Sequence, residues 1–220
     1  MTKVVASWSG GKDSCFACYK TILDGFDVVH LLNFLHEDGN RSSHGLRAEL
    51  LSIQSQAIGI PIVQGMTKRN TYEQEFKKIV SSLKQDDIQG IVFGDIYLQE
   101  HRDWIKRVCS EIDIRPIFPL WGMDTEKIVL DFIDSGFEAV IVAVKAEILG
   151  EEWLGQKVDK NLIEELKERK IDPCGESGEY HTFVVDGPLF KRRLKILEGD
   201  KVLKDRYWLL DISKYEIIDK

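Results

Sequence analysis

A glycine-rich hexapeptide near the N-terminus combines the groups that hold a phosphate. Residues 9–14 read Ser-Gly-Gly-Lys-Asp-Ser and lie between a short apolar run and a segment of helical character. Gly10 and Gly11 let backbone N–H groups approach an anion, and a helix beginning there presents free N–H groups and its positive dipole end. Lys12 adds positive charge, and the hydroxyls of Ser9 and Ser14 add donors. We therefore predict a phosphate-binding loop.

Asp13 distinguishes this loop from two common nucleotide-binding patterns. A Walker A loop has Ser or Thr directly after its lysine, whereas Asp13 follows Lys12 in this chain, and the Gly-x-Gly-x-x-Gly pattern is absent. A carboxylate inside a phosphate loop is expected where Mg²⁺ binds phosphate oxygens and one or two carboxylates. Asp13 is therefore the candidate Mg²⁺ ligand.

A second group of candidate residues follows a turn-rich stretch late in the chain. Glu176 and Glu179 are three residues apart among glycines, and His181 and Thr182 come directly after them. Two carboxylates and an imidazole in a loop suit binding of ammonium or Mg²⁺, or general-base chemistry. The alternative is a solvated acidic turn without a ligand.

Three further positions follow predicted strands. Gly94 and Asp95 come after the fourth apolar run, where Asp95 either orients a nucleotide or caps the next helix. His101 and Arg102 lie about one turn onward, either facing a substrate or forming a surface pair. His44 follows the second apolar run, in a loop that commonly reaches the adenine or ribose in such folds.

The four cysteines do not predict a metal site. Cys15 and Cys18 form a single pair, whereas Cys109 and Cys174 are isolated, and a structural zinc site needs a second pair of ligands. A redox dithiol needs an exposed thiol of low pKa. Because Cys15 and Cys18 fall within a helix expected to cover a sheet, we predict that they are buried packing residues.

The elements that position these residues follow from hydrophobic periodicity. Six short apolar runs are nearly continuous, as in buried parallel strands, and segments of helical period separate them. The runs are residues 4–8, 28–35, 60–63, 88–93, 114–117 and 139–144. Alternating strands and helices predict an α/β fold with a Rossmann-like parallel sheet over residues 1–145. The phosphate loop then lies at the carboxyl ends of the strands, where ligands bind.

A smaller α+β part is predicted over residues 146–220. A charged helix over residues 159–169 precedes the turn-rich stretch, and strand-like runs follow at residues 182–185, 193–197 and 208–212. We expect residues 1–145 to bind nucleotide and residues 146–220 to bind substrate.

Composition limits the class of protein. The 220 residues carry 30 Lys+Arg and 37 Asp+Glu, so the net charge is -7, which argues against stable nucleic-acid binding. No apolar run approaches the 18 or so residues of a membrane span. We also find no secretory signal, and we expect a cytoplasmic protein with reduced cysteines.

Longer motifs resemble a known family. The hexapeptide is similar to the pyrophosphate loop of the N-type ATP pyrophosphatases. Residues 175–184 and 186–190 resemble the C-terminal signature of the diphthine–ammonia ligase family. Residues 57–61, 119–122 and 152–155 resemble other stretches of that family. The resemblance implies an adenine nucleotide alpha hydrolase-like fold.

The resemblance also implies a reaction. ATP, with Mg²⁺, would adenylate a substrate carboxylate and release pyrophosphate, and ammonia would then displace AMP to form an amide. The implied ATP-binding residues are Ser9, Gly10, Gly11, Lys12, Asp13, Ser14, His44, Gly94 and Asp95. The implied catalytic or substrate residues are Glu176, Glu179, His181, Thr182, His101 and Arg102. The implied protein substrate is translation elongation factor 2 bearing diphthine, and a homodimer is left open.

One departure from the family pattern keeps alternatives open. The family members tied to diphthamide synthesis have Glu-Thr after the aromatic residue of the signature, whereas this chain has His181-Thr182. A related ligase for a small-molecule carboxylate, such as one in cobalamin metabolism, is the first alternative. A tRNA sulfurtransferase and an ATP-sensing module that leaves ATP intact are the others.

Overall fold

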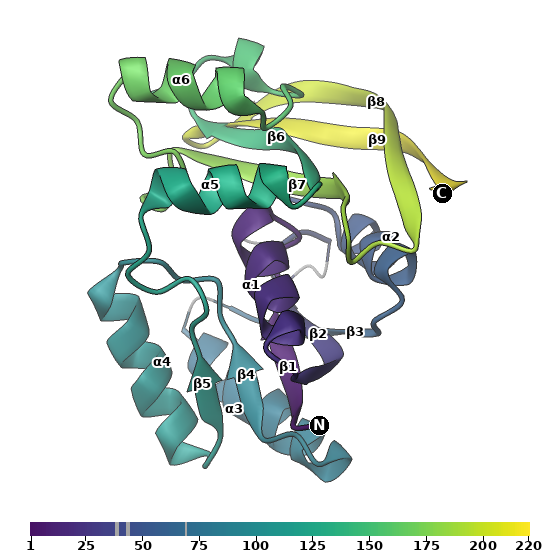
Figure 1. Ribbon diagram of the computed structural model, residues 1–220, viewed down its shortest axis with the longest axis vertical. Helices are drawn as coiled ribbons and strands as arrows, with labels where there is room; N and C mark the ends of the chain where they lie inside the picture. Colours follow the sequence, from purple (N-terminus) through teal and green to yellow (C-terminus); the bar gives the residue numbers. More distant parts are fainter. Residues whose placement is uncertain (38–39, 43–44, 69) are drawn as a thin grey trace.

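The computed structural model describes residues 1–37, 40–42, 45–68 and 70–220. Its first half is a five-stranded parallel sheet with the order β3-β2-β1-β4-β5 (Figure 1). The strands are β1 (Lys3–Ser7), β2 (Asp27–Leu35), β3 (Ile62–Met66), β4 (Gly90–Val92) and β5 (Arg115–Ile117). This order places β1 at the centre, so the loop after β1 lies at the middle of the sheet edge. The predicted Rossmann-like α/β fold is confirmed.

Helices cover both faces of the parallel sheet. They are α1 (Lys12–Leu23), α2 (Ala48–Ile58), α3 (Tyr72–Leu83) and α4 (Gln99–Glu111), with a 3-10 turn, η1, at Lys84–Asp86. Side chains alternate across a strand, so Val4 and Ala6 pack in the hydrophobic cluster of α1 and α2. Val5 packs in a separate cluster with α3 and α4. Cys15 and Cys18 are fully buried in the first cluster, as predicted.

The second half is built on a four-stranded antiparallel sheet with the order β7-β6-β9-β8. The strands are β6 (Glu138–Lys145), β7 (Tyr180–Asp186), β8 (Arg192–Lys204) and β9 (Tyr207–Asp219). Its helices are α5 (Thr125–Asp134) and α6 (Lys160–Glu168), with a 3-10 turn, η2, at Glu151–Trp153. Asp159 caps α6, because its carboxylate accepts a hydrogen bond from the Leu162 N–H at 2.9 Å.

The prediction that residues 139–144 form a strand of the parallel sheet is wrong. They lie in β6, which is antiparallel to β7 and β9. The apolar run is continuous because both faces of β6 are covered. No more than 2% of the surface is exposed in each of four consecutive residues, Ile141, Val142, Ala143 and Val144. Continuous apolar character reports burial on two faces and not strand direction. The change from one sheet to the other falls between β5 and β6, before residue 145.

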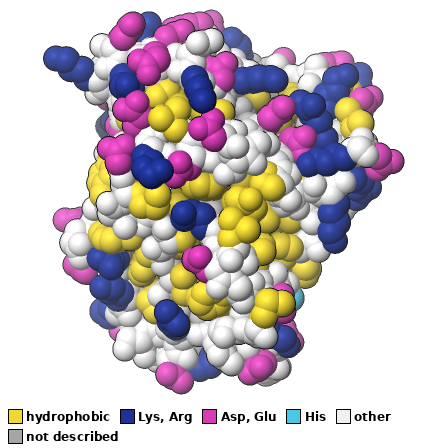
Figure 2. Space-filling view, in the orientation of Figure 1, with side chains coloured by type: hydrophobic (Ala, Val, Ile, Leu, Met, Phe, Trp, Pro, Cys, Tyr) yellow, Lys and Arg dark blue, Asp and Glu magenta, His cyan; other side chains and the backbone are white. Residues whose placement is uncertain are grey.

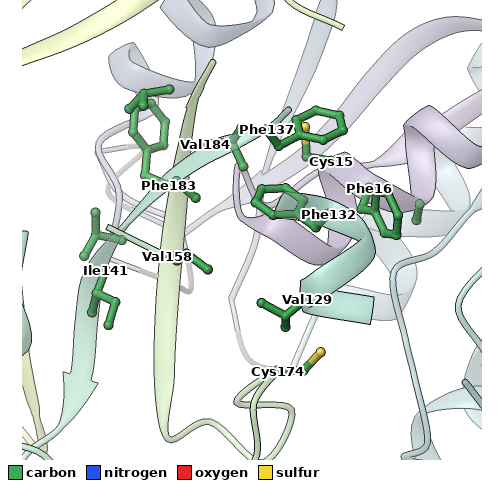
Figure 3. Close-up of a cluster of buried hydrophobic side chains, with 14 of the residues drawn as sticks. Cys15, Phe16, Val129, Phe132, Phe137, Ile141, Val158, Cys174, Phe183 and Val184 are labelled. Carbon is green, nitrogen blue, oxygen red and sulfur yellow. The ribbon is translucent and has the colours of Figure 1, made fainter. Parts of the chain in front are cut away.

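The two sheets share one hydrophobic core. Phe16 of α1 packs edge-to-face on Phe132 of α5, with ring centroids 6.1 Å apart, and on Phe137 at 6.2 Å (Figure 3). Phe183 and Val184 of β7 belong to the same cluster. This packing holds the beginning of β7 against the loop after β1.

The surface carries mixed charge. Figure 2 shows Lys and Arg side chains gathered at the edge of the molecule where β8 and the C-terminus lie. Several are paired with acids, including Arg193 with Glu138 at 2.6 Å and Lys214 with Glu198 at 3.0 Å. Among the residues that the structure describes, no helix is both long enough and apolar enough to cross a membrane.

Candidate active site

The predicted phosphate loop connects β1 to α1 and is internally hydrogen-bonded. Gly10 has a φ of 81°, and a Cβ there would lie 2.5 Å from Leu51 Cδ2, so only glycine fits. The hydroxyls of Ser9 and Ser14 are 3.0 Å apart, and the Gly11 N–H donates to Ser9 Oγ at 3.3 Å. The loop therefore has one defined shape.

The end of β4 lies directly on this loop. A Cβ at Gly94 would be 2.9 Å from the Asp13 carbonyl carbon and 2.9 Å from the Ser14 nitrogen. This close approach places Asp95 beside the loop, with its carboxylate 3.6 Å from His101 Nδ1. The cap of α4 is Leu98, so the alternative that Asp95 caps this helix is wrong.

The beginning of β7 and the turn before it complete the site. The Lys12 N–H donates to Thr182 Oγ1 at 3.0 Å, and the Val184 N–H donates to the Gly10 carbonyl at 3.0 Å. Lys12 Nζ donates to Asp13 Oδ2 at 2.9 Å and to the Cys174 carbonyl. Residues that are about 170 positions apart in the sequence thus form one wall of the site.

A cleft of about 320 Å³ opens between these segments, and we call it the nucleotide cleft. Most of the residues predicted for the site line it. They are Ser9, Gly11, Lys12, Asp13, Ser14, Gly94, Asp95, His101, Glu176, His181 and Thr182. Ser7, Leu98, Cys174, Gly175 and Tyr180 complete the lining.

Four predicted residues are not among those that line the cleft. Gly10 is buried beneath the loop, and His44 lies outside the described residues. The guanidinium of Arg102 lies over Trp121, 4.3 Å from its ring centroid, and the role of Arg102 in the reaction stays a prediction. The backbone carbonyl of Glu179 accepts from the Lys145 N–H at 2.9 Å. The carboxylate Oε2 of Glu179 is buried, and no residue in the described part of the chain hydrogen bonds to it.

The charge of Lys12 is held in place by its neighbours. Its side chain is 3% exposed, and burial alone would lower its pKa. Asp13, Tyr180 and Cys174, with Asp13 contributing most, together outweigh burial and raise the pKa of Lys12 above its ordinary value. Burial raises the pKa of Asp13, against the opposing effect of Lys12. Lys12 is therefore a fixed positive charge at the floor of the cleft.

Glu176 is the acid in the cleft whose titration is suited to neutral pH. Burial, together with the nearby carboxylates of Asp13 and Asp95, raises the pKa of Glu176 to about 7. Its Oε1 accepts a hydrogen bond from the Ile96 N–H at 2.9 Å, which fixes the carboxylate relative to the loop after β4. A carboxyl group with such a pKa can accept and release a proton near neutral pH.

The residues present fit a Mg²⁺ ion that arrives with a nucleotide. Asp13 Oδ1 is buried and has no hydrogen-bond partner among the residues that the structure describes, and Asp95 lines the same cleft. Within the described part of the chain, no group of three or more His, Cys, Asp or Glu side chains could hold a metal by itself. Mg²⁺ commonly uses one or two carboxylates and completes its shell with phosphate oxygens and water.

Sequence reasoning missed the residues that support the cleft from behind. Asp172 Oδ1 accepts from the Cys174 N–H at 3.0 Å, and Asp172 Oδ2 accepts from the Glu176 N–H at 3.1 Å. An Asp before a Pro-x-Gly turn is the available signal for such an arrangement. Gln54 is fully buried and donates to the carbonyls of Gly10 and Val184 at 3.0 and 2.7 Å. Nothing local in the sequence indicates that bridge.

Comparison with known proteins agrees with this architecture. Residues 2–116 match the family described as diphthamide synthase N-terminal domain, and residues 124–218 match the diphthamide synthase C-terminal domain. The two matches meet near the change between the two sheets.

Several known proteins are similar along most of this chain. The diphthine–ammonia ligases of Rattus norvegicus and Homo sapiens are each 27% identical over 91% of this chain and 85% of their own length. The diphthine–ammonia ligase of Schizosaccharomyces pombe is also 27% identical, but this chain spans 37% of its length.

A solved structure shares part of the arrangement. It is described as a predicted subunit of tRNA methyltransferase from Methanocaldococcus jannaschii, with 19% identity, a TM-score of 0.46, and coverage of 86% of this chain and 98% of that chain. That likeness is too low to support any argument about activity. The family matches, in contrast, cover nearly all of the sequence, and the chain therefore belongs to the diphthamide synthase family.

Proposed function

We propose that this protein is an ATP-dependent ligase that amidates a carboxylate with ammonia, converting diphthine to diphthamide on translation elongation factor 2. The observation that carries the proposal is the joining of the phosphate loop to Glu176 and Thr182 in one cleft. The family membership and the similarity to diphthine–ammonia ligases support the same reaction.

In the first step, a carboxylate oxygen of the acceptor attacks the α-phosphorus of ATP. A carbon–oxygen–phosphorus linkage forms as the bond between the α-phosphorus and the bridging oxygen breaks, and pyrophosphate leaves with that electron pair. Lys12 stabilises the negative charge that develops, because it is a fixed cation in a buried place. The loop around Gly11 positions the phosphates at the beginning of α1.

In this proposal, Asp13 and Asp95 would hold a Mg²⁺ ion that arrives with the nucleotide. Asp13 Oδ1 is a buried oxygen to which no described residue hydrogen bonds. When bound, Mg²⁺ neutralises phosphate charge that these carboxylates would otherwise repel.

In the second step, ammonia attacks the carbonyl carbon of the acyl-adenylate, and AMP leaves. An ammonium ion must lose a proton before it can attack, and the amide nitrogen loses another afterwards. Glu176 accepts a proton, since it lines the cleft and its pKa is about 7. Glu179, which we also predicted for this role, does not line the cleft, so its assignment to the reaction remains a prediction.

The test is a reconstituted reaction with ATP, Mg²⁺, ammonium and elongation factor 2 bearing diphthine. We expect AMP and pyrophosphate to form together with the amide, detected by mass spectrometry of the modified peptide. ATP that stays intact would support the sensor alternative and overturn the proposal. ADP and phosphate as products would overturn the adenylation step.

A ligase acting on a small-molecule carboxylate is the second candidate, because of one observation. His181 occupies the place of the family's Glu, and its imidazole is stacked on Tyr207 with ring centroids 5.9 Å apart. A changed residue in this position alters what the cleft admits next to the nucleotide. AMP formation with free carboxylates but not with the diphthine-bearing protein would favour this candidate.

The sulfurtransferase alternative is weakened by the chemistry of Cys174. This cysteine lines the cleft, but its thiol donates to the Thr125 carbonyl at 3.2 Å, and burial raises its pKa above the ordinary value. A nucleophilic cysteine needs the thiolate form. Cys174 is therefore a poor sulfur carrier in this arrangement.

A further inference from the structure

A second, smaller pocket adjoins the nucleotide cleft. It has a volume of about 210 Å³ and lies between the loop after β2 and the tip of the β8–β9 hairpin. We call it the acceptor pocket. The residues used in the argument below are His36, Arg41, Ser42, Lys204, Asp205 and Tyr207. Pockets that enclose a whole small molecule usually measure about 300 to 1,000 Å³, so this one suits a single side chain.

His181 forms the common wall of the two sites. It lines both the nucleotide cleft and the acceptor pocket. Its ring is stacked on Tyr207, and the Tyr207 hydroxyl donates to the Gly178 carbonyl at 3.1 Å. The hairpin tip is therefore tied to the turn that carries Glu176. A group bound in the acceptor pocket needs only to pass His181 to reach the nucleotide.

Ser42 supplies an unused hydrogen-bonding group in this pocket. It is 1% exposed, and no residue that the structure describes hydrogen bonds to its Oγ. Leaving a buried hydroxyl unpaired costs stability, so such groups usually have a partner. A ligand oxygen that accepts from Ser42 Oγ would supply it.

The charge of the acceptor pocket is opposite to that of the nucleotide cleft. Among the described residues, Arg41 and Lys204 line the acceptor pocket with a single acid, Asp205. Arg41 is also paired at 2.8 Å with Asp211, which lies outside the lining. Lys204 offsets Asp205 at the hairpin tip. In the nucleotide cleft, Lys12 faces several carboxylates instead. An acceptor carboxylate is thus attracted to the acceptor pocket and repelled from the unliganded cleft.

We propose that this pocket binds the acceptor, a carboxylate-bearing side chain presented by the protein substrate, and that Ser42 and Lys204 contact the carboxylate. The inference rests on the proposed function, because it assigns the second substrate of that reaction. The carboxylate is drawn in by the positive charge around Arg41. It passes His181 to meet the α-phosphate of ATP in the neighbouring cleft.

The first test is Ser42→Ala, with Ser81→Ala on the exposed face of α3 as the matched control. Loss of one hydrogen bond to a charged group should raise the KM for diphthine-bearing elongation factor 2 about tenfold or more. The KM for ATP should stay within about twofold, and thermal stability should not fall, because the deleted hydroxyl has no partner in the free protein. Ser81→Ala should change none of these values.

The second test is Lys204→Glu, with Lys201→Glu on the same hairpin as the control. Lys204 lines the pocket and Lys201 does not, although both are exposed. Lys204→Glu should raise the KM for the acceptor on the order of tenfold at low salt, and added salt should shrink the difference. Lys201→Glu should have a much smaller effect.

The outcomes separate this inference from the proposed function. If the wild-type protein forms no amide on this substrate, the proposed function fails and the inference fails with it. If the wild type is active but both variants keep the wild-type KM for the acceptor, the inference alone is overturned. A raised KM for ATP with an unchanged KM for the acceptor would assign the pocket to the nucleotide and also overturn it.

Discussion

The nucleotide cleft and the acceptor pocket share His181 but are opposite in charge. The cleft contains Asp13, Asp95 and Glu176 around Lys12, whereas the pocket lies beside two arginines that share Asp211. On our proposal, this difference lets electrostatics separate the nucleotide from the acceptor carboxylate. The nucleotide would enter the acidic cleft with a divalent cation, and the acceptor carboxylate would enter the pocket without one.

The largest expected effect on this comparison comes from Lys12→Met, which removes the cation of the cleft at similar volume. We expect turnover to fall about 100-fold to 1,000-fold, by analogy with loss of one preorganised charge-stabilising group. The partly buried Asp13 carboxylate would lose its partner, so the free energy of unfolding should fall by about 1 to 3 kcal/mol. Steady-state kinetics and urea unfolding measure the two effects.

The double variant Lys12→Met, Asp13→Asn is the control for folding. It removes the uncompensated charge, so stability should largely return while turnover stays low. Turnover near the wild-type rate in either variant would remove Lys12 from the reaction.

A comparison of Glu176→Gln with Glu179→Gln sharpens the assignment of the base. Both changes remove a carboxylate at constant shape, but only Glu176 lines the cleft. We expect Glu176→Gln to slow amide formation about 100-fold, within the usual range for a general base, and Glu179→Gln to slow it much less. Single-turnover amidation, together with calorimetric ATP binding, provides the measurement. The reverse order would show that Glu179 is the base.

The acidity of the cleft should also appear in the pH dependence of stability. The pKa of Glu176 is about 7 in the folded protein and 4.5 ordinarily, so the folded state binds more protons between these values. Stability must then fall as pH rises from about 4.5 to 7, by about 3 kcal/mol from this group. Urea unfolding across this range should give a shallower decline for Glu176→Gln than for the wild type. Equal slopes would contradict a raised pKa.

The smallest expected effect is that of Tyr207→Phe at the boundary between the two sites. The ring still stacks on His181, but the hydrogen bond to the Gly178 carbonyl is lost, at a cost of about 1 kcal/mol of stability. Tyr215→Phe on the same strand is the control, since it loses a comparable bond to Glu49 at 2.8 Å. Only Tyr207→Phe should also change the KM for the acceptor, by about twofold. If the two variants had the same KM for the acceptor, the hydrogen bond between the β8–β9 hairpin and Gly178 would not affect the site.

Much of the fold and the phosphate loop could be predicted because their signals are local. The segment Ser9–Ser14 combines glycines, a lysine and hydroxyls between a strand and a helix, and the structure places it at the centre of the sheet edge. The helical spacing of apolar residues in α3 and α4 can be read along a continuous segment of sequence, so these helices could be found without tertiary information. The direction of β6 could not, since its apolar run records only that both faces are covered.

The candidate site was predicted less completely, because part of it depends on distant contacts. Arg102 reads as a cation available to a substrate, but Trp121 and Phe118 occupy its guanidinium. Glu176 and Glu179 look equivalent in the sequence, yet of the two only Glu176 bonds to the loop after β4 and lines the cleft. Gln54 bridges the phosphate loop to β7 from a helix position that resembles any other polar residue.

The sequence by itself determined the chemistry at the end of β1 and the identity of the groups that follow β4 and precede β7. Backbone conformation, helix period and charge are properties of neighbouring residues, so a short segment specifies them. Only the tertiary structure decided which of these groups share a cleft, and that a pocket of opposite charge adjoins it. The physical reason is that burial and pKa depend on groups such as Lys12 and Cys174, which meet only after the two sheets have packed on one core.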